Sequence, residues 1–297
     1  MKLLVTGAAG QVGWELARAL QPLSEVVAVD RSQLDLADGD ALRAFVRGGA
    51  FDVIVNAAAY TAVDQAEKDE ALAAAVNARA PAILAEEGRR AGALLVHYST
   101  DYVFDGEASR PYREDDATAP LNAYGRTKLE GERLIAAAGG DWLVLRTEWV
   151  YGSRGRNFLR TMLRLAAERD RLTVVDDQFG APTSARLLAD ASAQIITRAL
   201  AERRAGRFAS EVLHLTAGGS TSWHGFATAI IAGAGARGLP VRCTEVTGIP
   251  ATQYPTPARR PVNSRLDLTR VRERFGIEPP PWQAGLALAL DEVADPT

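Results

Sequence analysis

Tyr124 and Lys128 stand four residues apart at the start of a helical pattern that runs from Tyr124 to Ala138. Residues with this spacing lie on one face of a helix. A free phenol has a pKa of about 10, so it is a poor acid–base group at neutral pH. A neighbouring ammonium favours the phenolate, and we expect it to move the pKa of Tyr124 toward neutral pH. The pair therefore predicts a proton-transfer catalyst.

Thr100 is a third candidate, because the segment HYSTDY places it just after a predicted strand, Leu94–Tyr98. Its hydroxyl can hydrogen-bond a substrate carbonyl beside the tyrosine, or it can simply cap the end of the strand. The combination of Thr100, Tyr124 and Lys128 favours the catalytic interpretation.

A glycine-rich segment follows the first predicted strand and opens the first predicted helix. Gly7, Gly10 and Gly13 have the spacing G-x-x-G-x-x-G, and Gln11 and Val12 lie between the last two. Glycine at such a turn lets a pyrophosphate approach backbone N–H groups and the positive end of a helix. The segment therefore predicts a dinucleotide site.

Asp30 ends the second predicted strand, where an acid can accept hydrogen bonds from the adenosine ribose and repel a 2′-phosphate. Arg31 follows it and could neutralise that phosphate, so the sequence leaves NADH and NADPH both open. The small residues Ala57, Ala58 and Ala59 close the third strand and allow a cofactor to lie against the backbone.

Strands that alternate with helices would bring these candidate residues together at one edge of a sheet. Near-continuous apolar runs, typical of strands buried on both faces of a parallel sheet, occur at Lys2–Thr6, Glu25–Val29, Asp52–Asn56, Leu94–Tyr98 and Trp142–Arg146. Helical patterns lie between them, at Gln11–Leu20, Asp40–Val46, Glu70–Glu87 (with Pro81 interrupting) and Tyr124–Ala138. We predict an α/β fold with a doubly wound parallel (Rossmann) sheet, which brings the ends of the strands to one ligand-binding edge.

The second half of the chain predicts a smaller C-terminal substrate lobe. Residues 1–150 form the expected dinucleotide-binding domain and 151–297 mainly the substrate lobe, with 172–215 returning to the first sheet. Helices are expected at Asn157–Glu168 and Arg186–Arg203, and strands of the same sheet at Leu172–Val175 and Val212–Leu215.

Composition narrows the class of protein. The 297 residues are 47% hydrophobic and 24% charged, with a net charge of −3, which gives no electrostatic case for nucleic acid or an anionic membrane. We expect neither a leader peptide nor a membrane span, and a cytoplasmic location. The single Cys243 cannot form an internal disulfide, and no Cys/His cluster has zinc spacing.

The glycine segment TGAAGQVG, the threonine at the fourth strand end and the Y-x-x-x-K pair together resemble the extended short-chain dehydrogenases. GQVGWEL, DVIVNAAAYTAVDQAE, HYSTDYVFDG, LNAYGRTKLEGE, DQFGAPT and YPTPARRPVNSRL are similar to the dTDP-4-dehydrorhamnose reductase family. These segments span nearly the whole chain.

The resemblance implies that a hydride passes from NADPH or NADH to the C4 keto group of dTDP-4-dehydro-L-rhamnose. Tyr124 would donate the proton, Lys128 would tune it and hold the nicotinamide ribose, and Thr100 would orient the carbonyl. The implied cofactor residues are Gly7, Gly10, Gln11, Val12, Gly13, Asp30, Asp35, Leu36, Ala57, Ala58, Ala59, Tyr124 and Lys128. Those for the dTDP-linked sugar are Val63, Thr100, Asp101, Tyr102, Trp149, Arg259 and Arg260.

Two residues depart from the family pattern. Glu148 stands where the family usually has Ser, so the substrate pocket can differ. Some members join subunits through magnesium; Glu15 fits such a site, but Arg186 stands where we expect an acid, so no metal is predicted and a homodimer stays open.

Other enzymes and one binding protein are the alternatives. A sugar-nucleotide 4,6-dehydratase is disfavoured because it needs Asp-Glu after the threonine, where this chain has Asp101 and Tyr102. Another 4-ketoreductase or an epimerase stays open, as does a non-catalytic subunit similar to the regulatory subunit of methionine adenosyltransferase. The sequence does not decide the nucleotide base or the product stereochemistry.

Overall fold

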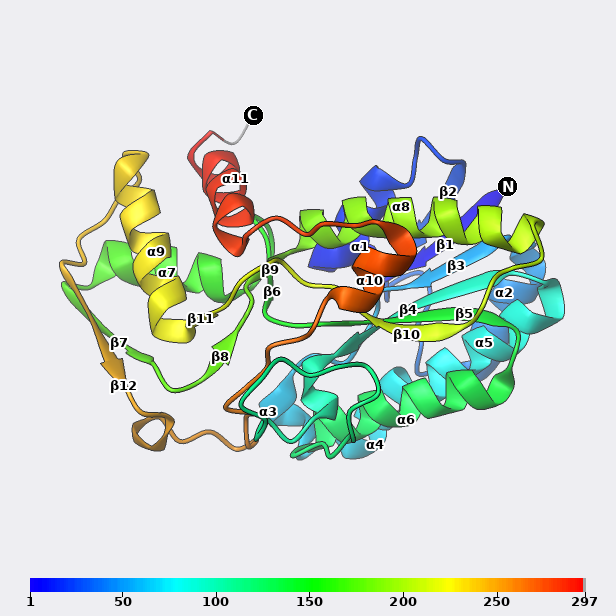
Figure 1. Cartoon of the computed structure of the whole chain (residues 1–297), viewed down its shortest axis with the longest axis horizontal. Coiled ribbons are helices and arrows are strands. Elements are labelled where there is room, and N and C mark those ends of the chain that lie inside the picture. Colours follow the sequence, from blue (N-terminus) through cyan, green and yellow to red (C-terminus); the bar gives the residue numbers. More distant parts are fainter. Residues whose placement is uncertain (296–297) are drawn as a thin grey trace.

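Six parallel strands form the central sheet of the computed structural model, which describes residues 1–295 (Figure 1). Their spatial order is β10-β5-β4-β3-β1-β2, so the direction of strand addition reverses between β1 and β3. The bounds are β1 Lys2–Thr6, β2 Glu25–Val29, β3 Val53–Asn56, β4 Leu94–Thr100, β5 Asp141–Thr147 and β10 Glu211–His214. The predicted α/β fold with a doubly wound parallel sheet is confirmed, because the apolar runs are the buried strands.

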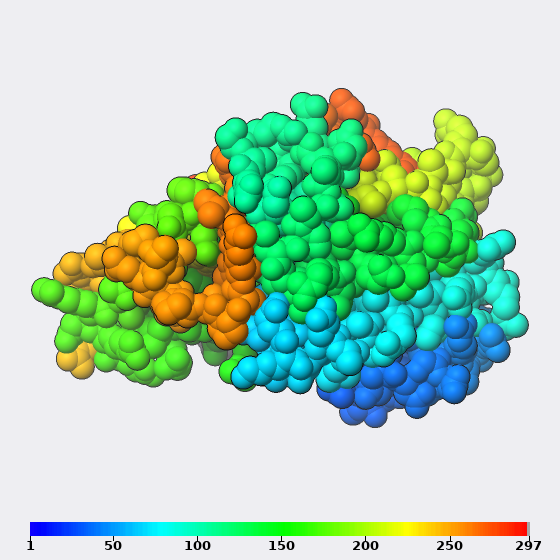
Figure 2. Space-filling model, turned by 90° about the horizontal axis from the view of Figure 1, so that it is seen from below, coloured from blue at the N-terminus to red at the C-terminus, as the bar shows by residue number. Residues whose placement is uncertain are grey.

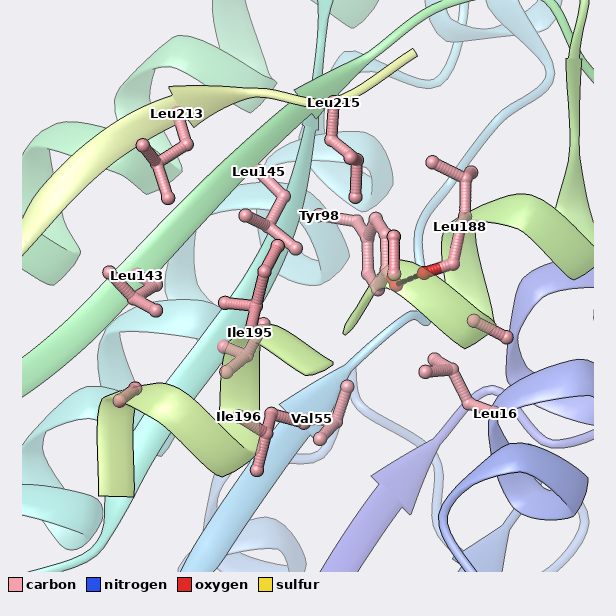
Figure 3. Close-up of a cluster of buried hydrophobic side chains, with 14 of the residues drawn as sticks. Leu16, Val55, Tyr98, Leu143, Leu145, Leu188, Ile195, Ile196, Leu213 and Leu215 are labelled. Carbon is pink, nitrogen blue, oxygen red and sulfur yellow. Dashed lines mark hydrogen bonds between the residues drawn. The ribbon is translucent and has the colours of Figure 1, made fainter. Parts of the chain in front are cut away.

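Helices cover both faces of this sheet. One face carries α1 (Gln11–Ala19), α8 (Ala185–Arg204) and α10 (Thr269–Phe275). The other carries α2 (Gly39–Gly49), α5 (Ala80–Ala91) and α6 (Ala123–Ala138). Figure 3 shows the packing on the first face, where Tyr98 of β4 and Leu188 of α8 meet among leucine and isoleucine side chains. No helix within residues 1–295 is both long enough and apolar enough to cross a bilayer.

The predicted helix at Glu70–Glu87 is divided in the structure. It consists of α4 (Glu70–Ala74), a π-helical turn (Ala75–Arg79) and α5, in which Pro81 lies in the first turn. Pro81 thus directly follows the change from π-helical to α-helical hydrogen bonding. A Cβ on Gly131 of α6 would lie 2.2 Å from the carbonyl oxygen of Asn77, so this glycine lets α6 pack closely on the π turn.

The smaller lobe has its own apolar core between α7 (Phe158–Glu168), α9 (Trp223–Ala236) and α11 (Trp282–Ala294). It contains the parallel pair β7 (Arg171–Val175) and β12 (Glu245–Ile249). The prediction that Leu172–Val175 joins the central sheet is therefore wrong. Side chains of β7 alternate between exposed and buried, which suits a strand covered on one face only.

The chain passes between the two lobes several times. After β7, short strands β8 (Phe179–Gly180) and β9 (Thr183–Ser184) lead into α8, and β10 then pairs with β5. The prediction that Val212–Leu215 adds a strand to the central sheet is confirmed, because β10 (Glu211–His214) covers most of this range. The other short elements are β6 (Val150–Tyr151), β11 (Thr221–Ser222), α3 (Val63–Ala66) and the 3₁₀ turns Asp101–Val103 and Ala251–Gln253. Figure 2 shows the orange segment around residue 255 lying between the smaller lobe and the main body.

Candidate active site

A cleft of about 650 Å³ lies at the carboxyl ends of β1, β3, β4 and β5. It brings together residues from the glycine segment, the three polar catalytic candidates and the start of the smaller lobe. The predicted residues that line it are Gly7, Gly10, Gln11, Val12, Asp30, Asp35, Leu36, Ala57, Ala58, Ala59, Val63, Thr100, Asp101, Tyr102, Tyr124, Lys128 and Trp149. Gly13, Arg259 and Arg260 do not line it.

The glycine segment is a tight turn between β1 and α1. Gly7 has φ of +77°, and a Cβ there would lie 2.8 Å from the backbone of Ala58. A Cβ on Gly13 would lie 2.1 Å from the Gly7 carbonyl oxygen. Gly13 therefore serves the close packing of helix on turn rather than the cleft wall. The nine-residue α1 begins at Gln11 and directs its N-terminus at the cleft, so the turn fits the pyrophosphate of a dinucleotide.

Asp30 ends its strand in a side-chain turn at the cleft wall. Its Oδ1 accepts hydrogen bonds from the backbone N–H and hydroxyl of Ser32, at 2.8 and 2.6 Å, and these bonds lower the pKa of the carboxyl group. Arg31 is largely exposed and pairs with Asp35 at 3.3 Å. Both an acid and a cation therefore lie where the ribose of a dinucleotide is expected.

Tyr124 and Lys128 lie on α6, whose N-terminus is capped by Asn122. The Asn122 Oδ1 accepts from the backbone N–H of Gly125 at 2.9 Å. A Cβ on Gly125 would lie 2.2 Å from the Tyr102 carbonyl oxygen, so this glycine lets α6 approach the turn after β4. Tyr102 then packs edge-on against Tyr124, with ring centroids 5.5 Å apart.

The protonation of this pair differs from the sequence-based expectation. Burial raises the pKa of Tyr124 to about 12, against a lowering by the Thr100 hydroxyl. Burial also lowers the pKa of Lys128 to about 8, and no hydrogen bond joins the two side chains within residues 1–295. The prediction that Lys128 moves the pKa of Tyr124 toward neutral pH is wrong for this structure, because loss of hydration, with the charge of Asp101, outweighs the lowering by the Thr100 hydroxyl. The phenol is protonated at neutral pH, the form a proton donor needs.

Two buried carboxyl groups adjoin the catalytic candidates. Asp101 and Glu148 are 3% and 2% exposed. Burial raises the pKa of Asp101 to about 6 and that of Glu148 well above its usual range, and the charge of Asp101 raises the pKa of Glu148 further. Within the described residues, one oxygen of Asp101 and both of Glu148 have no hydrogen-bond partner. Glu148 therefore favours its protonated form. The sequence could not show this, because it does not show that the side chain is buried.

Trp149 forms the cleft wall beside Glu148. Its backbone φ is +47°, a conformation that bulky side chains rarely adopt. The indole stacks on Trp223 of α9, and a Cβ on Gly180 would lie 2.6 Å from its ring. Val63, at the first position of α3, lines the same cleft. The wall offers a flat aromatic face and an aliphatic side chain to a ligand.

The two predicted phosphate-binding arginines lie outside the cleft wall. Arg260 pairs with Asp64 at 2.8 Å. Burial raises the pKa of Tyr102, and the charge of Arg260 offsets part of this rise. Arg259 is exposed and lies 3.7 Å from Glu107. Arg260 is therefore near the cleft, whereas Arg259 is near the loop at residue 107.

Several polar residues of the site were not predicted. Ser99 donates to Glu132 at 2.5 Å, and Glu132 forms a buried ion pair with Arg146 at 2.7 Å. His97 lies two residues before Ser99 in β4, and its ring contacts the amino group of Lys128. The alternation of side chains along a strand could have shown that His97 and Ser99 point to the same face, because residues two apart share a face. Gln11 also contacts Asn157, which caps α7, through a hydrogen bond of 2.8 Å.

Arginines occupy the acidic surface where magnesium was considered. Arg18 pairs with Glu15 and Asp190, at 3.0 and 2.9 Å. Arg186 pairs with Glu292 and lies 3.8 Å from Glu15. Within residues 1–295 no three His, Cys, Asp or Glu side chains are grouped as metal ligands. The donor set is already neutralised by guanidinium groups, so it does not fit a magnesium ion.

Comparison with known proteins gives matches over the whole chain. The family model described as the RmlD substrate binding domain matches residues 1–295. A dTDP-4-dehydrorhamnose reductase of Burkholderia thailandensis is 53% identical and is covered to 99%, as is this chain. A crystal structure of such a reductase from Clostridium acetobutylicum has a TM-score of 0.90 at 36% identity, covering 99% of this chain and 100% of that one. The Bacillus anthracis reductase in complex with NADP has a TM-score of 0.87 at 32% identity, covering 98% and 99%.

Proposed function

The chain belongs to the RmlD family of dTDP-4-dehydrorhamnose reductases, and from this membership we propose the reaction and the role of each residue. The protein is an NAD(P)H-dependent oxidoreductase that reduces the C4 keto group of dTDP-4-dehydro-L-rhamnose to the alcohol of dTDP-L-rhamnose. The observation that carries the proposal is that one cleft contains the glycine turn together with Thr100, Tyr124 and Lys128.

Gly7, Gly10 and the first turn of α1 would hold the dinucleotide pyrophosphate, and Asp30 the adenosine ribose. When bound, the nicotinamide supplies a hydride to C4 of the sugar. The small residues Ala57 and Ala58 leave room for the cofactor against the backbone. Arg31 lies beside Asp30, so the site accommodates either cofactor.

Tyr124 is the proposed proton donor. Addition of hydride to the carbonyl carbon turns the oxygen into an alkoxide, which takes the phenolic proton and leaves Tyr124 as a phenolate. The pKa of about 12 keeps the phenol protonated before this step, and the alkoxide is the stronger base. The Thr100 hydroxyl, which donates to Asp101 in the free protein, would turn to the same oxygen and stabilise its developing charge. Lys128 stabilises the phenolate that remains.

The other cleft residues would bind the sugar nucleotide. Trp149 covers one face of the deoxysugar ring, and Val63 and Tyr102 bound the same space. Asp101 offers a carboxyl group next to Thr100, to which it is joined by a hydrogen bond of 2.9 Å. Arg260 is placed near Tyr102 and can reach a diphosphate if Asp64 releases it.

The test is turnover of dTDP-4-dehydro-L-rhamnose by the purified protein, with NADPH and NADH in parallel. We expect stoichiometric loss of nicotinamide absorbance and formation of dTDP-L-rhamnose. An epimerase would convert the sugar without net oxidation of cofactor. A regulatory subunit would do neither, and either result would contradict the proposal.

A further inference from the structure

Lys128 is held by two contacts from β4 rather than by a carboxylate. The residue is 1% exposed, and its Nζ lies 2.5 Å from the Tyr98 carbonyl oxygen and 3.2 Å from Nε2 of His97. An ammonium has three N–H donors, so these contacts leave one for the cleft that Lys128 lines. His97 therefore helps to fix the direction of the remaining donor.

His97 is the first member of a buried polar row that crosses the sheet. Its Nδ1 lies 2.9 Å from Nδ2 of Asn56, and the Asn56 Oδ1 accepts from the Thr6 hydroxyl at 2.7 Å. The three residues are register partners on β4, β3 and β1, and each is at most 1% exposed. Thr6 directly precedes Gly7. The row thus connects the Lys128 amino group to the base of the glycine turn.

Hydrogen-bond chemistry allows this row two arrangements. When Asn56 donates to Nδ1, the imidazole proton is on Nε2, and Nε2–H can donate to Lys128 only if its amine is neutral. A charged Lys128 must instead donate to a lone pair on Nε2. The proton is then on Nδ1, the Asn56 amide turns over to accept it, and its NH₂ group donates to Thr6. Both arrangements satisfy Lys128, His97 and Asn56, and Thr6 changes from donor to acceptor between them.

We propose that His97 is a positioning residue of the reductase, which holds the Lys128 amino group in both its charged and its neutral form by exchanging ring tautomers. Asn56 and Thr6 follow the exchange, so the direction of the Thr6 hydroxyl beside the glycine turn depends on the charge of Lys128. The relevance to turnover rests on the proposed function; the tautomer exchange does not.

The surrounding charges permit this exchange at accessible pH. Burial lowers the pKa of Lys128 to about 8, and Glu132, one turn further along α6, opposes the lowering. The ion pair with Arg146 on β5 neutralises Glu132. Burial and the charge of Lys128 hold the pKa of His97 well below its usual range, so its ring stays neutral. Tyr124 on α6, Asp101 and Tyr102 after β4, and Glu148 after β5 are further titratable groups that line the same cleft.

Nitrogen NMR of the full-length protein labelled in its histidines tests the tautomer directly, without cofactor or substrate. The chain has three histidines, and loss of one signal in His97→Gln identifies His97. We expect its protonated nitrogen to change from Nδ1 to Nε2 as the pH rises through about 8, and Lys128→Met to abolish the change. A single His97 tautomer across that range would overturn the proposal, whether or not the protein is a reductase.

Kinetics test the positioning role, with a second buried histidine as control. His214 is fully buried, and neither of its ring nitrogens has a hydrogen-bond partner among the described residues. We expect His97→Leu to lower kcat at least about tenfold, because misplaced catalytic groups are costly. His97→Gln should recover part of the loss, since its amide can donate or accept near the position of Nε2, and His214→Leu should keep kcat within about twofold. Wild-type kcat in His97→Leu, with a Tm matching His214→Leu, would overturn the role.

Discussion

Trp149 stacks on Trp223 with ring centroids 3.5 Å apart and ring planes within 7° of parallel. The contact joins the segment between β5 and β6 to the first turn of α9, so a side chain that directly follows the central sheet is held by the smaller lobe. It also supports an indole whose backbone has a positive φ. The two lobes therefore determine together the shape of the cleft wall that we propose to bind the sugar.

Replacement of Trp223 should weaken the binding of the sugar nucleotide. We expect Trp223→Ala to raise the KM for the keto-sugar about two- to tenfold, since an aromatic pair contributes about 0.5–1.5 kcal/mol beyond its buried area. Trp223→Phe should retain part of the stack and have a smaller effect. The KM for NADPH should not change, because Trp223 supports Trp149, which we assign to the sugar and not to the cofactor. Equal increases in both KM values would show general damage instead.

Tyr124→Phe should lower kcat at least about a hundredfold, because it removes the proposed general acid. Dinucleotide affinity, measured by fluorescence titration, should largely survive. Tyr151→Phe is a matched control, because Tyr151 is buried in the smaller lobe and its hydroxyl has no partner among the described residues. Near wild-type turnover in Tyr124→Phe would remove this residue from the mechanism.

Asp30 and Arg31 should have opposite effects on cofactor choice. Asp30→Ala is expected to weaken NADH more than NADPH, because ribose hydrogen bonds and phosphate repulsion are lost together. Arg31→Ala should weaken NADPH more, since it removes the cation next to the 2′-phosphate. Ser32→Ala controls for loss of the turn that Ser32 forms with Asp30. Identical changes in the two KM values would place the ribose elsewhere.

Glu148 should make the protein less stable as the pH rises. Its folded-state pKa lies above the ordinary value of 4.5, so its protonated form stabilises the fold fully below about pH 4.5. That contribution is lost as the pH rises through the folded-state pKa. Glu148→Gln, which stays neutral, should therefore raise Tm at alkaline pH by about 2 °C or more and flatten its pH dependence.

The exposed Glu130→Gln on the same protein should leave the Tm profile unchanged. A Glu148→Gln profile that parallels the wild type would mean that Glu148 is ionised in the folded state. A neutral Glu148 would also explain how an acid can stand next to Asp101 without an arginine or lysine in direct contact among the described residues.

The central sheet could be predicted because its strands are buried on both faces and are therefore nearly continuous apolar runs. The same reasoning assigned Leu172–Val175 to the wrong sheet, since an apolar run does not identify its partner strand. Spacing placed Tyr124, Lys128 and Thr100 in one cleft, because each lies at an element end that the topology brings together.

The state of those groups could not be predicted in the same way. Burial, which depends on the whole fold, raises the pKa of Tyr124 and lowers that of Lys128. The row from His97 to Thr6 depends on the register of three strands that are far apart in the sequence. Gly13 was assigned to the cofactor, yet its backbone lies against the Gly7 carbonyl, a contact that appears only in the folded chain.

Deuterium transfer to the sugar is the most direct test of the reductase assignment. The protein would be incubated with dTDP-4-dehydro-L-rhamnose and NADPH carrying deuterium on one face of the reactive nicotinamide carbon, and the sugar product would be examined by NMR. We predict one deuterium at C4 of dTDP-L-rhamnose from one of the two labelled cofactors and none from the other. Deuterium at another carbon, or a product without deuterium from both cofactors, would contradict the assignment.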